Sequence, residues 1–333
     1  MGKLVCVTGA SGYIASWLVK LLLHNGYTVN ATVRNLSDPS KIEHLKALQG
    51  AKERLKLFQA DLLEKGSFDS AIDGCDGVFH SASPVMLGDI INPQKELIDP
   101  AVKGTLNVLS SCLKAPTVKR VVLTSSMASV FVERKRKTTE TLVDETYFSD
   151  PEFVEENKEW YILSKTLAEK AAIEFADQNG IDLLVMNPGL VTGPLLQPTL
   201  NLTTRAFLDL IREGKSMTTP SGIFLFVDVR DVAKAHVLAF ENPSSNGRYC
   251  LVANVVYNSE VLGVLRELYP TLDLSKSSQV DQRDIQRFQV SRAKAESLGI
   301  NFMSLEQSLK DTIESLKERK LIECSDYGCE SKI

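Results

Sequence analysis

Long apolar stretches are absent from this chain of 333 residues. A helix that spans a bilayer needs about 20 consecutive apolar residues, and no run approaches that length. The apolar run at residues 4–7 is also too short for the core of a signal peptide. We therefore predict a cytoplasmic protein with no membrane segment.

An excess of positive charge is also missing. The chain carries 38 Lys and Arg against 42 Asp and Glu, a net charge of −4. A protein that binds nucleic acid needs a basic face that neutralises phosphates, so we expect no nucleic-acid partner. We expect a small-molecule partner and a monomeric protein, with a dimer as the alternative.

Histidines and cysteines are few and scattered. The four histidines and six cysteines lack the paired spacing of metal ligands, so we predict no metal site and reduced thiols. Cys324 and Cys329 could pair under oxidation, and nothing in the sequence decides whether they do. His80 and His236 lie in an apolar strand and a periodic helix, where we expect packed structural residues.

Short apolar runs alternate with helical patterns through the first half of the chain. This alternation is typical of right-handed crossovers and a parallel sheet, and it predicts an α/β protein with a Rossmann-type doubly wound sheet. The predicted strands are 4–8, 28–33, 55–59, 77–80, 120–124 and 182–186. The predicted helices are 13–24, 40–48, 67–72, 94–113 and 159–179.

The pattern changes after Pro188, where prolines separate the elements. A smaller C-terminal lobe for the substrate fits this change, with a cleft between the two parts. The elements expected there are helices 203–212, 228–241, 259–268, 291–298 and 305–320 and a strand at 248–252. The predicted Rossmann domain spans 1–190 and takes back 215–245, the substrate lobe spans 191–214 and 246–325, and 326–333 form a tail.

A glycine-rich turn, Gly9-Ala10-Ser11-Gly12-Tyr13-Ile14-Ala15, joins the first predicted strand to the first helix. Gly9 permits a tight turn, Gly12 lets the backbone approach a pyrophosphate, and Ala15 lets helix and strand pack closely. The free N–H groups and positive dipole of a helix start favour an anion. At the head of a five-strand alternation, this turn predicts a dinucleotide site.

The end of the second strand indicates which dinucleotide binds. NAD enzymes commonly place an acid there to bind the ribose hydroxyls, whereas this chain has Thr32-Val33-Arg34, with Lys41 seven residues later. Positive charge suits a 2′-phosphate, so we predict NADP(H). Asp61 and Leu62 are expected to flank the adenine. The alternative is that Arg34 and Lys41 are ordinary surface cations.

Tyr161 and Lys165 are one turn apart on a predicted helix and so share a face. With eight tyrosines and 38 basic residues, about one such pair is expected by chance. The prediction therefore depends on where the pair lies in the chain. It follows a strand that ends in Thr124-Ser125-Ser126, and ligands of open α/β sheets bind at that edge. A surface Tyr–Lys pair is the alternative.

These three residue types suit carbonyl reduction. A phenol has a pKa of about 10, and a nearby ammonium is expected to lower that pKa, so that Tyr161 can transfer a proton near neutrality. Ser126 is expected to hydrogen-bond the carbonyl oxygen as charge develops, and Lys165 to hold the nicotinamide ribose. Because reduction needs the protonated tyrosine, we predict reduction as the easier direction.

The motifs together resemble extended short-chain dehydrogenases/reductases, in particular the plant dihydroflavonol reductase and cinnamoyl-CoA reductase group. The resemblance covers nearly the whole chain and implies an NADP-dependent oxidoreductase of CH–OH and carbonyl groups in plant specialised metabolism. The segments that carry it are 7–14, 60–62, 77–80, 102–105, 123–126, 161–165, 187–188, 193–194, 228–233 and 247–249.

The resemblance also implies the site residues. It makes Ser126, Tyr161 and Lys165 catalytic. The residues that it places at NADP(H), besides Tyr161 and Lys165, are Gly9, Ser11, Gly12, Tyr13, Ile14, Arg34, Lys41, Asp61, Leu62, Ser81, Ala82, Ser83, Pro188, Gly189, Leu190, Val191 and Thr203. The substrate contacts that we expect are Pro84, Val85, Met127 and Phe131.

The substrate class follows from departures within that group. Cinnamoyl-CoA reductases carry Asn-Trp-Tyr-Cys-Tyr-Gly-Lys, whereas residues 159–165 are Glu-Trp-Tyr-Ile-Leu-Ser-Lys, closer to the phenylacetaldehyde reductase and cinnamyl-alcohol-dehydrogenase-like branch. Dihydroflavonol reductases usually have a polar residue where this chain has Phe131. We therefore predict an apolar, aromatic aldehyde or ketone. Segments 84–92 and 132–142 are expected to border the pocket.

Several alternatives stay open. A dihydroflavonol-type ketone reductase and a cinnamoyl-CoA reductase-like enzyme share the predicted chemistry. A sugar-nucleotide epimerase or dehydratase shares the fold, but Arg34 and the missing second-strand acid argue against it. A non-catalytic NADP-sensing protein is a different class, and the retained Tyr161 argues against that. The substrate, the stereochemistry and the oligomeric state do not follow from the sequence.

Overall fold

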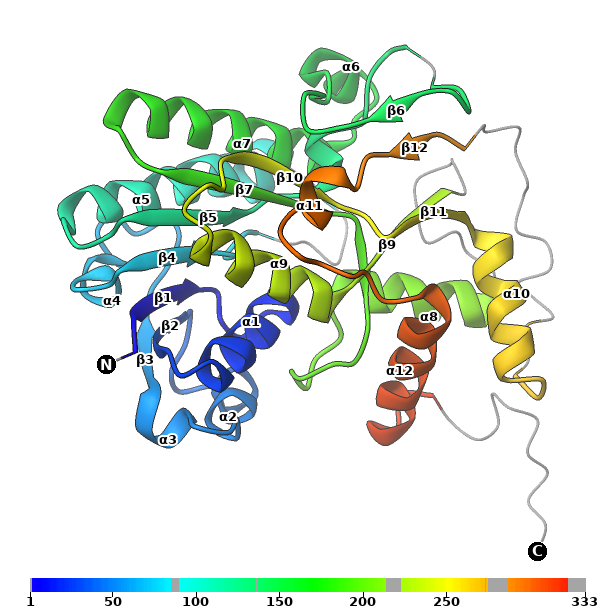
Figure 1. The fold of residues 1–333 in the computed structure, drawn as a ribbon, viewed down its shortest axis with the longest axis horizontal. Coiled ribbons are helices and arrows are strands. Elements are labelled where there is room, and N and C mark those ends of the chain that lie inside the picture. Colours follow the sequence, from blue (N-terminus) through cyan, green and yellow to red (C-terminus); the bar gives the residue numbers. More distant parts are fainter. Residues whose placement is uncertain are drawn as a thin grey trace, which may run out of the picture.

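Figure 1 shows the helices and strands of the computed structural model, which describes residues 2–84, 90–135, 137–213, 223–272, 274 and 287–322. A seven-stranded sheet runs through the centre, and all its neighbouring strands are parallel. From edge to edge it consists of β10 (Gly247–Leu251), β7 (Leu183–Pro188), β5 (Arg120–Thr124), β4 (Gly77–His80), β1 (Leu4–Thr8), β2 (Thr28–Val33) and β3 (Leu55–Gln59). This order confirms the predicted Rossmann-type sheet.

The first five strands have their predicted bounds. They are easy to predict because helices cover both faces of a parallel sheet, so that central strands are apolar along their whole length. Every residue of β4 and β5 is buried, whereas the edge strand β3 contains only half-buried and exposed residues. The strand order turns back between β1 and β4, and such a switch point is where open α/β sheets bind ligands.

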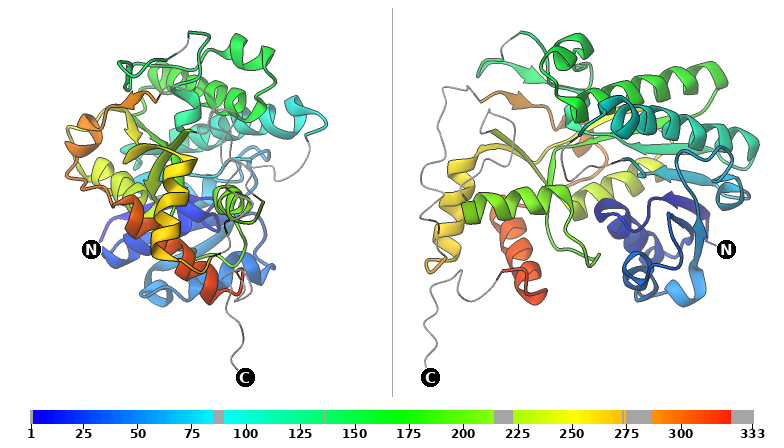
Figure 2. Two further views of the ribbon diagram at one scale, coloured as in Figure 1. Left: turned by 90° about the vertical axis from the view of Figure 1, so that its right-hand side faces the viewer. Right: turned by 180° about the vertical axis from the view of Figure 1, so that it is seen from behind.

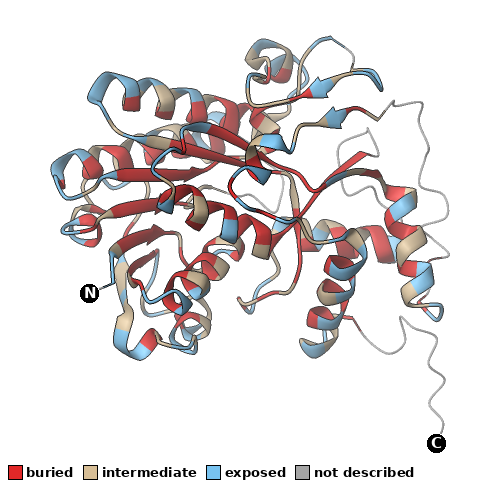
Figure 3. Ribbon diagram, viewed as in Figure 1, coloured by how far each residue is buried: buried red, intermediate tan, exposed pale blue. Residues whose placement is uncertain are grey.

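Helices cover both faces of the sheet (Figure 1). On one face α5 (Asp99–Lys114) packs beside α7 (Trp160–Asn179), and on the other α1 (Tyr13–His24) packs beside α9 (Val229–Glu241). Their sheet-facing sides are buried and their outer sides exposed (Figure 3). The remaining short helices around the sheet are α2 (Pro39–Lys46), α3 (Ala51–Arg54), α4 (Asp69–Ile72), α6 (Pro151–Glu156) and the π-helical η1 (Gln94–Ile98).

The smaller lobe lies beyond the carboxyl ends of the central strands, at the end away from the N-terminus (Figure 2). It contains two small sheets, one with the order β11-β9-β8 and one in which β12 pairs with β6. Its strands are β6 (Leu142–Val143), β8 (Leu190–Thr192), β9 (Ile223–Asp228), β11 (Asn254–Tyr257) and β12 (Gln289–Val290). Its helices are α8 (Leu202–Glu213), α10 (Asn258–Leu268), α11 (Ala293–Glu296) and α12 (Leu305–Glu318).

Three strands depart from the predicted domain boundaries. The sequence assigns 1–190 and 215–245 to the Rossmann domain, but β6 and β9 pair within the two small sheets. Residues 246–325 are assigned to the substrate lobe by the sequence, but β10 pairs with β7 and forms an edge of the large sheet. The small-lobe strands are not among the predicted ones, because β6, β8, β11 and β12 are only two to four residues long and show no period. The division into two domains otherwise stays a prediction, and the tail 326–333 lies outside the described residues.

Candidate active site

The glycine-rich turn connects the end of β1 to the start of α1. Gly9 has a φ of +64°, and a Cβ atom there would lie 2.8 Å from the Cα atom of Ala82, so the turn requires glycine. Gly12 is the N-cap of α1, and no side chain caps the first turn. Its N–H groups therefore remain available to a phosphate. Ser11 is half-buried in the same turn.

The segment after β4 lies against this turn. The backbone N–H groups of Ser81 and Ala82 both donate to Oγ1 of Thr8, each at 3.1 Å. Together with Ser83, these residues are half-buried. The structure thus brings 81–83 next to Gly9, although more than 70 residues separate them in the chain.

The side chains of Tyr13 and Ile14 do not line this surface. The Tyr13 ring is buried, and its hydroxyl donates to the carbonyl oxygen of Gly193 at 2.7 Å; burial raises the pKa of Tyr13 well above its ordinary value. Ile14 packs against the core. What these two residues offer a phosphate is their main-chain N–H groups at the start of α1.

The two predicted 2′-phosphate ligands have different surroundings. Arg34 follows β2, is exposed, and forms no ion pair with any residue in the described part of the chain. Lys41 lies in α2, next to Asp38, whose pKa is lowered chiefly by the hydrogen bonds of Ser40 and to a smaller extent by the charge of Lys41. Neither cation forms an ion pair within the described residues.

Asp61 and Leu62 lie in a fixed turn at the end of β3. The carboxylate of Asp61 accepts from the backbone N–H of Leu63 at 2.8 Å, and the side chain of Asn107 donates to the carbonyl oxygen of Leu62 at 2.8 Å. Both residues are half-buried. Their position at the carboxyl end of a strand beside β2 is compatible with an adenine between them and Arg34.

Ser126, Tyr161 and Lys165 come together at the carboxyl end of β5. Ser126 caps the short 3₁₀ helix η2 (Met127–Ser129), because its hydroxyl accepts from the backbone N–H of Ala128 at 3.1 Å. That hydroxyl also interacts with the phenol of Tyr161. Lys165 follows one turn later on α7 and is 8% exposed.

The pKa values of the pair are set by burial. Burial raises the pKa of Tyr161 above 10, and the interaction with Ser126 opposes this only in part. The expected lowering by the ammonium is therefore wrong in direction. Burial lowers the pKa of Lys165 to about 8, against an opposing effect of Glu169. At neutral pH Tyr161 is a protonated phenol and Lys165 an ammonium.

Lys165 fits a bound ribose. Its ammonium forms no ion pair, and its Nζ atom has no hydrogen bond among the described residues. Its three N–H donors are therefore free, and ribose hydroxyls would be acceptors for them. Lys165, the uncapped start of α1 and the exposed Arg34 are thus donors suited to the ribose, the pyrophosphate and the 2′-phosphate of a dinucleotide.

Residues 188–191 run between the two parts of the protein, from β7 into β8. A Cβ atom on Gly189 would lie 2.1 Å from the carbonyl oxygen of Leu225, so the chain passes β9 too closely for any side chain. Thr203 donates its hydroxyl to the carbonyl oxygen of Val191 at 2.8 Å. Thr203 therefore stabilises residues 188–191, and its hydroxyl proton is used in this main-chain hydrogen bond.

The predicted substrate residues have different environments. The Phe131 ring packs on Phe288, with ring centroids 5.6 Å apart, in an apolar cluster that joins η2 to the smaller lobe. Met127 is 1% exposed in the same cluster, so its side chain belongs to the core and the predicted substrate contact does not fit it. Pro84 is half-buried, and Val85 lies outside the described residues.

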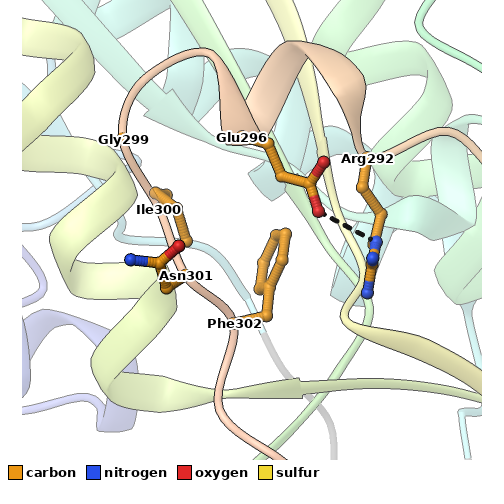
Figure 4. Close-up of a pocket in the computed structure, with 6 residues that line it drawn as sticks. All are labelled: Arg292, Glu296, Gly299, Ile300, Asn301 and Phe302. Atoms are coloured by element: carbon orange, nitrogen blue, oxygen red, sulfur yellow. Dashed lines mark ion pairs between the residues drawn. The ribbon is translucent and has the colours of Figure 1, made fainter.

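A cavity of about 450 Å³ lies elsewhere, between α11 and the segment that follows it (Figure 4). None of its lining residues is a predicted site residue. Its charged side chains are paired, since Arg292 and Glu296 approach to 3.2 Å and Arg292 donates to the carbonyl oxygen of Ala253. In the described part of the chain, no three His, Cys, Asp or Glu side chains could hold a metal ion.

The family model of the NAD dependent epimerase/dehydratase family matches residues 5–255. The chain belongs to this family. That range contains the glycine-rich turn, Arg34, Ser126, Tyr161 and Lys165, so family membership and the geometry concern the same residues. It confirms the predicted resemblance to extended short-chain dehydrogenases/reductases, and with it an oxidoreductase that uses a nicotinamide dinucleotide.

Several similar proteins bear the names of reductases. The chain is 56% identical over 320 residues to "Cinnamoyl-CoA reductase CAD2" of Medicago truncatula, covering 96% of this chain and 97% of the relative. The structure of vestitone reductase from alfalfa is similar with a TM-score of 0.83 at 34% identity, covering 96% and 100% of the two chains. Yeast methylglyoxal/isovaleraldehyde reductase Gre2, solved with NADPH, has the same TM-score at 29% identity and the same coverage.

Sequence reasoning missed two charged residues beside the predicted catalytic residues. Glu169 and Arg248 form a buried ion pair, with Oε1 of Glu169 2.5 Å from Nε of Arg248. The available signal is that Glu169 follows Lys165 by four residues and so shares its helix face. Nothing local marks Arg248 as its partner.

Proposed function

We propose that the protein is an NADPH-dependent reductase that converts an apolar aldehyde or ketone to its alcohol. The observation that carries this proposal is the meeting of Ser126 with Tyr161, one turn before an unpartnered Lys165, at the carboxyl end of β5. A phenol, a hydroxyl and an ammonium in one place suit protonation of a carbonyl oxygen.

Tyr161, Ser126 and Lys165 have different roles in the proposed reaction. When bound, NADPH supplies the hydride that adds to the carbonyl carbon. The Tyr161 hydroxyl gives its proton to the oxygen, and the Ser126 hydroxyl donates a hydrogen bond to the same oxygen as negative charge develops there. The ammonium of Lys165 donates to the ribose hydroxyls and so orients the ring beside Tyr161.

The raised pKa of Tyr161 favours reduction over oxidation. Reduction starts from the protonated phenol, which is the form present at neutral pH. Alcohol oxidation would start from the phenolate, which costs about 4 kcal/mol at pH 7 for an unshifted phenol and more for a raised pKa. The burial of Tyr161 thus favours carbonyl reduction over alcohol oxidation at neutral pH.

The preference for NADPH over NADH is supported by Arg34 and by the NADPH complex of the yeast relative. The exposed guanidinium has no competing carboxylate among the described residues, and its planar shape suits a phosphate. Lys41 adds a second cation from α2. We assign Asp61, Leu62, 81–83 and 188–191 to the remaining cofactor surface.

The proposed substrate is a class of carbonyl compounds. Apolar side chains surround η2, and Phe131 is half-buried at the edge of this cluster, which favours an apolar, aromatic carbonyl compound of plant specialised metabolism. A cinnamoyl-CoA reductase-like activity is the second candidate, because the Medicago relative bears that name. The chain departs from that group at 162–164, and for this reason we place an aldehyde or ketone first.

Consumption of NADPH with a panel of carbonyl compounds tests the proposal. The panel contains aromatic aldehydes, dihydroflavonols, coenzyme A thioesters and terpenoid ketones, each with the Tyr161→Phe variant as its blank. We expect turnover with an aromatic aldehyde or ketone. Turnover with thioesters alone would select the second candidate, and NADPH binding without any turnover would favour a sensor.

The proposed setting is cytoplasmic and the proposed state monomeric. Among the described segments, no helix is both long and apolar enough to cross a membrane. The four described cysteines are buried free thiols, which suits a reducing compartment. Sedimentation of the purified protein would decide between a monomer and a dimer.

A further inference from the structure

Glu169 is a buried carboxylate directly behind the catalytic residues. It is 1% exposed and follows Lys165 by one turn of α7. Its Oε2 atom accepts hydrogen bonds from the hydroxyls of Ser125 and Ser129 and from Nδ2 of Asn187, the last at 2.8 Å. A carboxylate with three such donors on one oxygen is fixed in place.

The donors surround Ser126. Ser125 precedes it and Ser129 lies three residues beyond it, so Glu169 holds the main chain on both sides of the catalytic hydroxyl. Asn187 donates to the carbonyl oxygen of Ser126 as well, at 3.2 Å. Hydrogen bonds thus connect the segment that carries Ser126, at the end of β5, to the strand β7 and the helix α7.

Arg248 completes the group from β10. It is 7% exposed, its Nη1 donates to the carbonyl oxygens of Glu145 and Tyr147, and its guanidinium lies 3.7 Å from the centre of the Phe148 ring. Two ions in a protein interior lose their hydration, and such pairs are often no more stabilising than apolar residues of the same size. Stability alone is therefore a weak reason for this pair.

The carboxylate also acts on the ammonium of Lys165. Burial lowers the pKa of Lys165, and the negative charge of Glu169 opposes that effect. The other titratable groups that face Lys165 are Tyr161 on its own helix and His80 on β4. His80 is neutral, because burial and Lys165 lower its pKa to about 3, which leaves Glu169 as the charge that opposes the effect of burial on Lys165.

We propose that Glu169, held by Arg248, is a positioning residue of the active site that fixes the Ser126 segment and maintains the charge of Lys165. This inference rests on the proposed reductase function, since it assigns Ser126 and Lys165 their roles there. Glu169 touches none of the reacting atoms and acts through these two residues.

The Glu169→Gln variant tests both roles, with Glu174→Gln as the matched control. Glu174 is an exposed glutamate on the same helix. In Glu169→Gln we expect kcat to fall between about tenfold and hundredfold through misplacement of Ser126. Because the neutral glutamine would no longer oppose the effect of burial on Lys165, we expect the loss of NADPH affinity at alkaline pH to begin about one pH unit lower. Glu174→Gln should match the wild type in both.

Ser125→Ala and Ser129→Ala separate the two roles. Each removes one hydroxyl from the carboxylate and leaves both charges in place. We expect a lower kcat with an unchanged pH dependence of NADPH affinity, measured by fluorescence titration. These small buried replacements also keep the test valid if Glu169→Gln does not fold.

Two results would overturn the inference. One is a Glu169→Gln protein that keeps the wild-type kcat and pH dependence. The other is wild-type kcat in both serine variants together with an unfolded Glu169→Gln protein, which would make Glu169 a structural residue only. If no carbonyl compound is turned over by the wild type, the proposed function fails, while the NADPH titrations still measure the effect of Glu169 on Lys165.

Discussion

The hydroxyl of Thr8 lies 2.8 Å from Nδ1 of His80, joining the carboxyl ends of the neighbouring strands β1 and β4. The same hydroxyl oxygen accepts the backbone N–H groups of Ser81 and Ala82. Its one proton therefore goes to Nδ1, which leaves the ring proton on Nε2, 3.4 Å from Oγ1 of Thr105. This hydroxyl organises the segment that closes over the glycine-rich turn.

Thr8→Val should destabilise the protein and weaken NADPH binding. The isosteric replacement leaves two backbone N–H groups and a histidine nitrogen without partners, at about 1–3 kcal/mol for each buried group left unsatisfied. Chemical denaturation and NADPH titration measure the two effects. Thr146→Val removes an exposed hydroxyl that bonds only Asp144 and should change stability by less than about 0.5 kcal/mol. Equal effects of both variants would contradict this role of Thr8.

Tyr161→Phe should abolish carbonyl reduction while NADPH still binds. The variant keeps the ring and loses the proton, and general acid catalysis contributes about 10²- to 10⁴-fold. Single-turnover kinetics and NADPH fluorescence separate the two effects. Tyr27→Phe is the control, because Tyr27 is also buried but donates to Glu241. Retained reduction in Tyr161→Phe would remove the assigned proton donor.

Arg34→Glu should reverse the choice of cofactor. A carboxylate at this position would repel the 2′-phosphate and could accept from the ribose hydroxyls, so the Kd for NADPH should rise far more than that for NADH. Arg134→Glu, which alters an exposed arginine paired with Glu156, is the charge-matched control. If both Kd values changed equally, Arg34 would not contact the 2′-phosphate.

The pH dependence should identify Lys165. Its pKa is about 8 in the folded protein, so the ammonium is lost as pH rises through that value, and NADPH affinity should fall there. Stability should change in the opposite direction, because an unfolded lysine keeps its proton to about pH 10.4 and the native state then gains relative stability above pH 8. Lys165→Met should lack both effects. A wild-type affinity independent of pH would exclude the assigned role.

Local patterns predict the first half of the fold well. The strands from β1 to β5 are continuous apolar runs separated by helices with their own period, and both signals lie within a few residues. The pairing of β10 with β7 has no such signal, because residues 247–251 look like a strand in either sheet. Which sheet it joins depends on the position of a strand more than 60 residues earlier in the chain.

Local sequence patterns also predict only part of the site. Ser126, Tyr161 and Lys165 can be found from their order along a known type of sheet. The Glu169–Arg248 pair cannot, since 79 residues separate its members. The direction of the Tyr161 pKa shift is also missed, because a four-residue spacing shows the neighbouring charge but not the extent of burial, and burial decides the outcome.

The late position of β10 has a consequence for synthesis of the protein. While a nascent chain is extended from its N-terminus, α7 is complete before Arg248 exists, and burial of an unpaired carboxylate is costly. Glu169 must then stay hydrated until the last strand of the large sheet is added. Completing the large sheet and completing this ion pair thus require the same strand, and a chain that ends before residue 247 lacks the partner of Glu169.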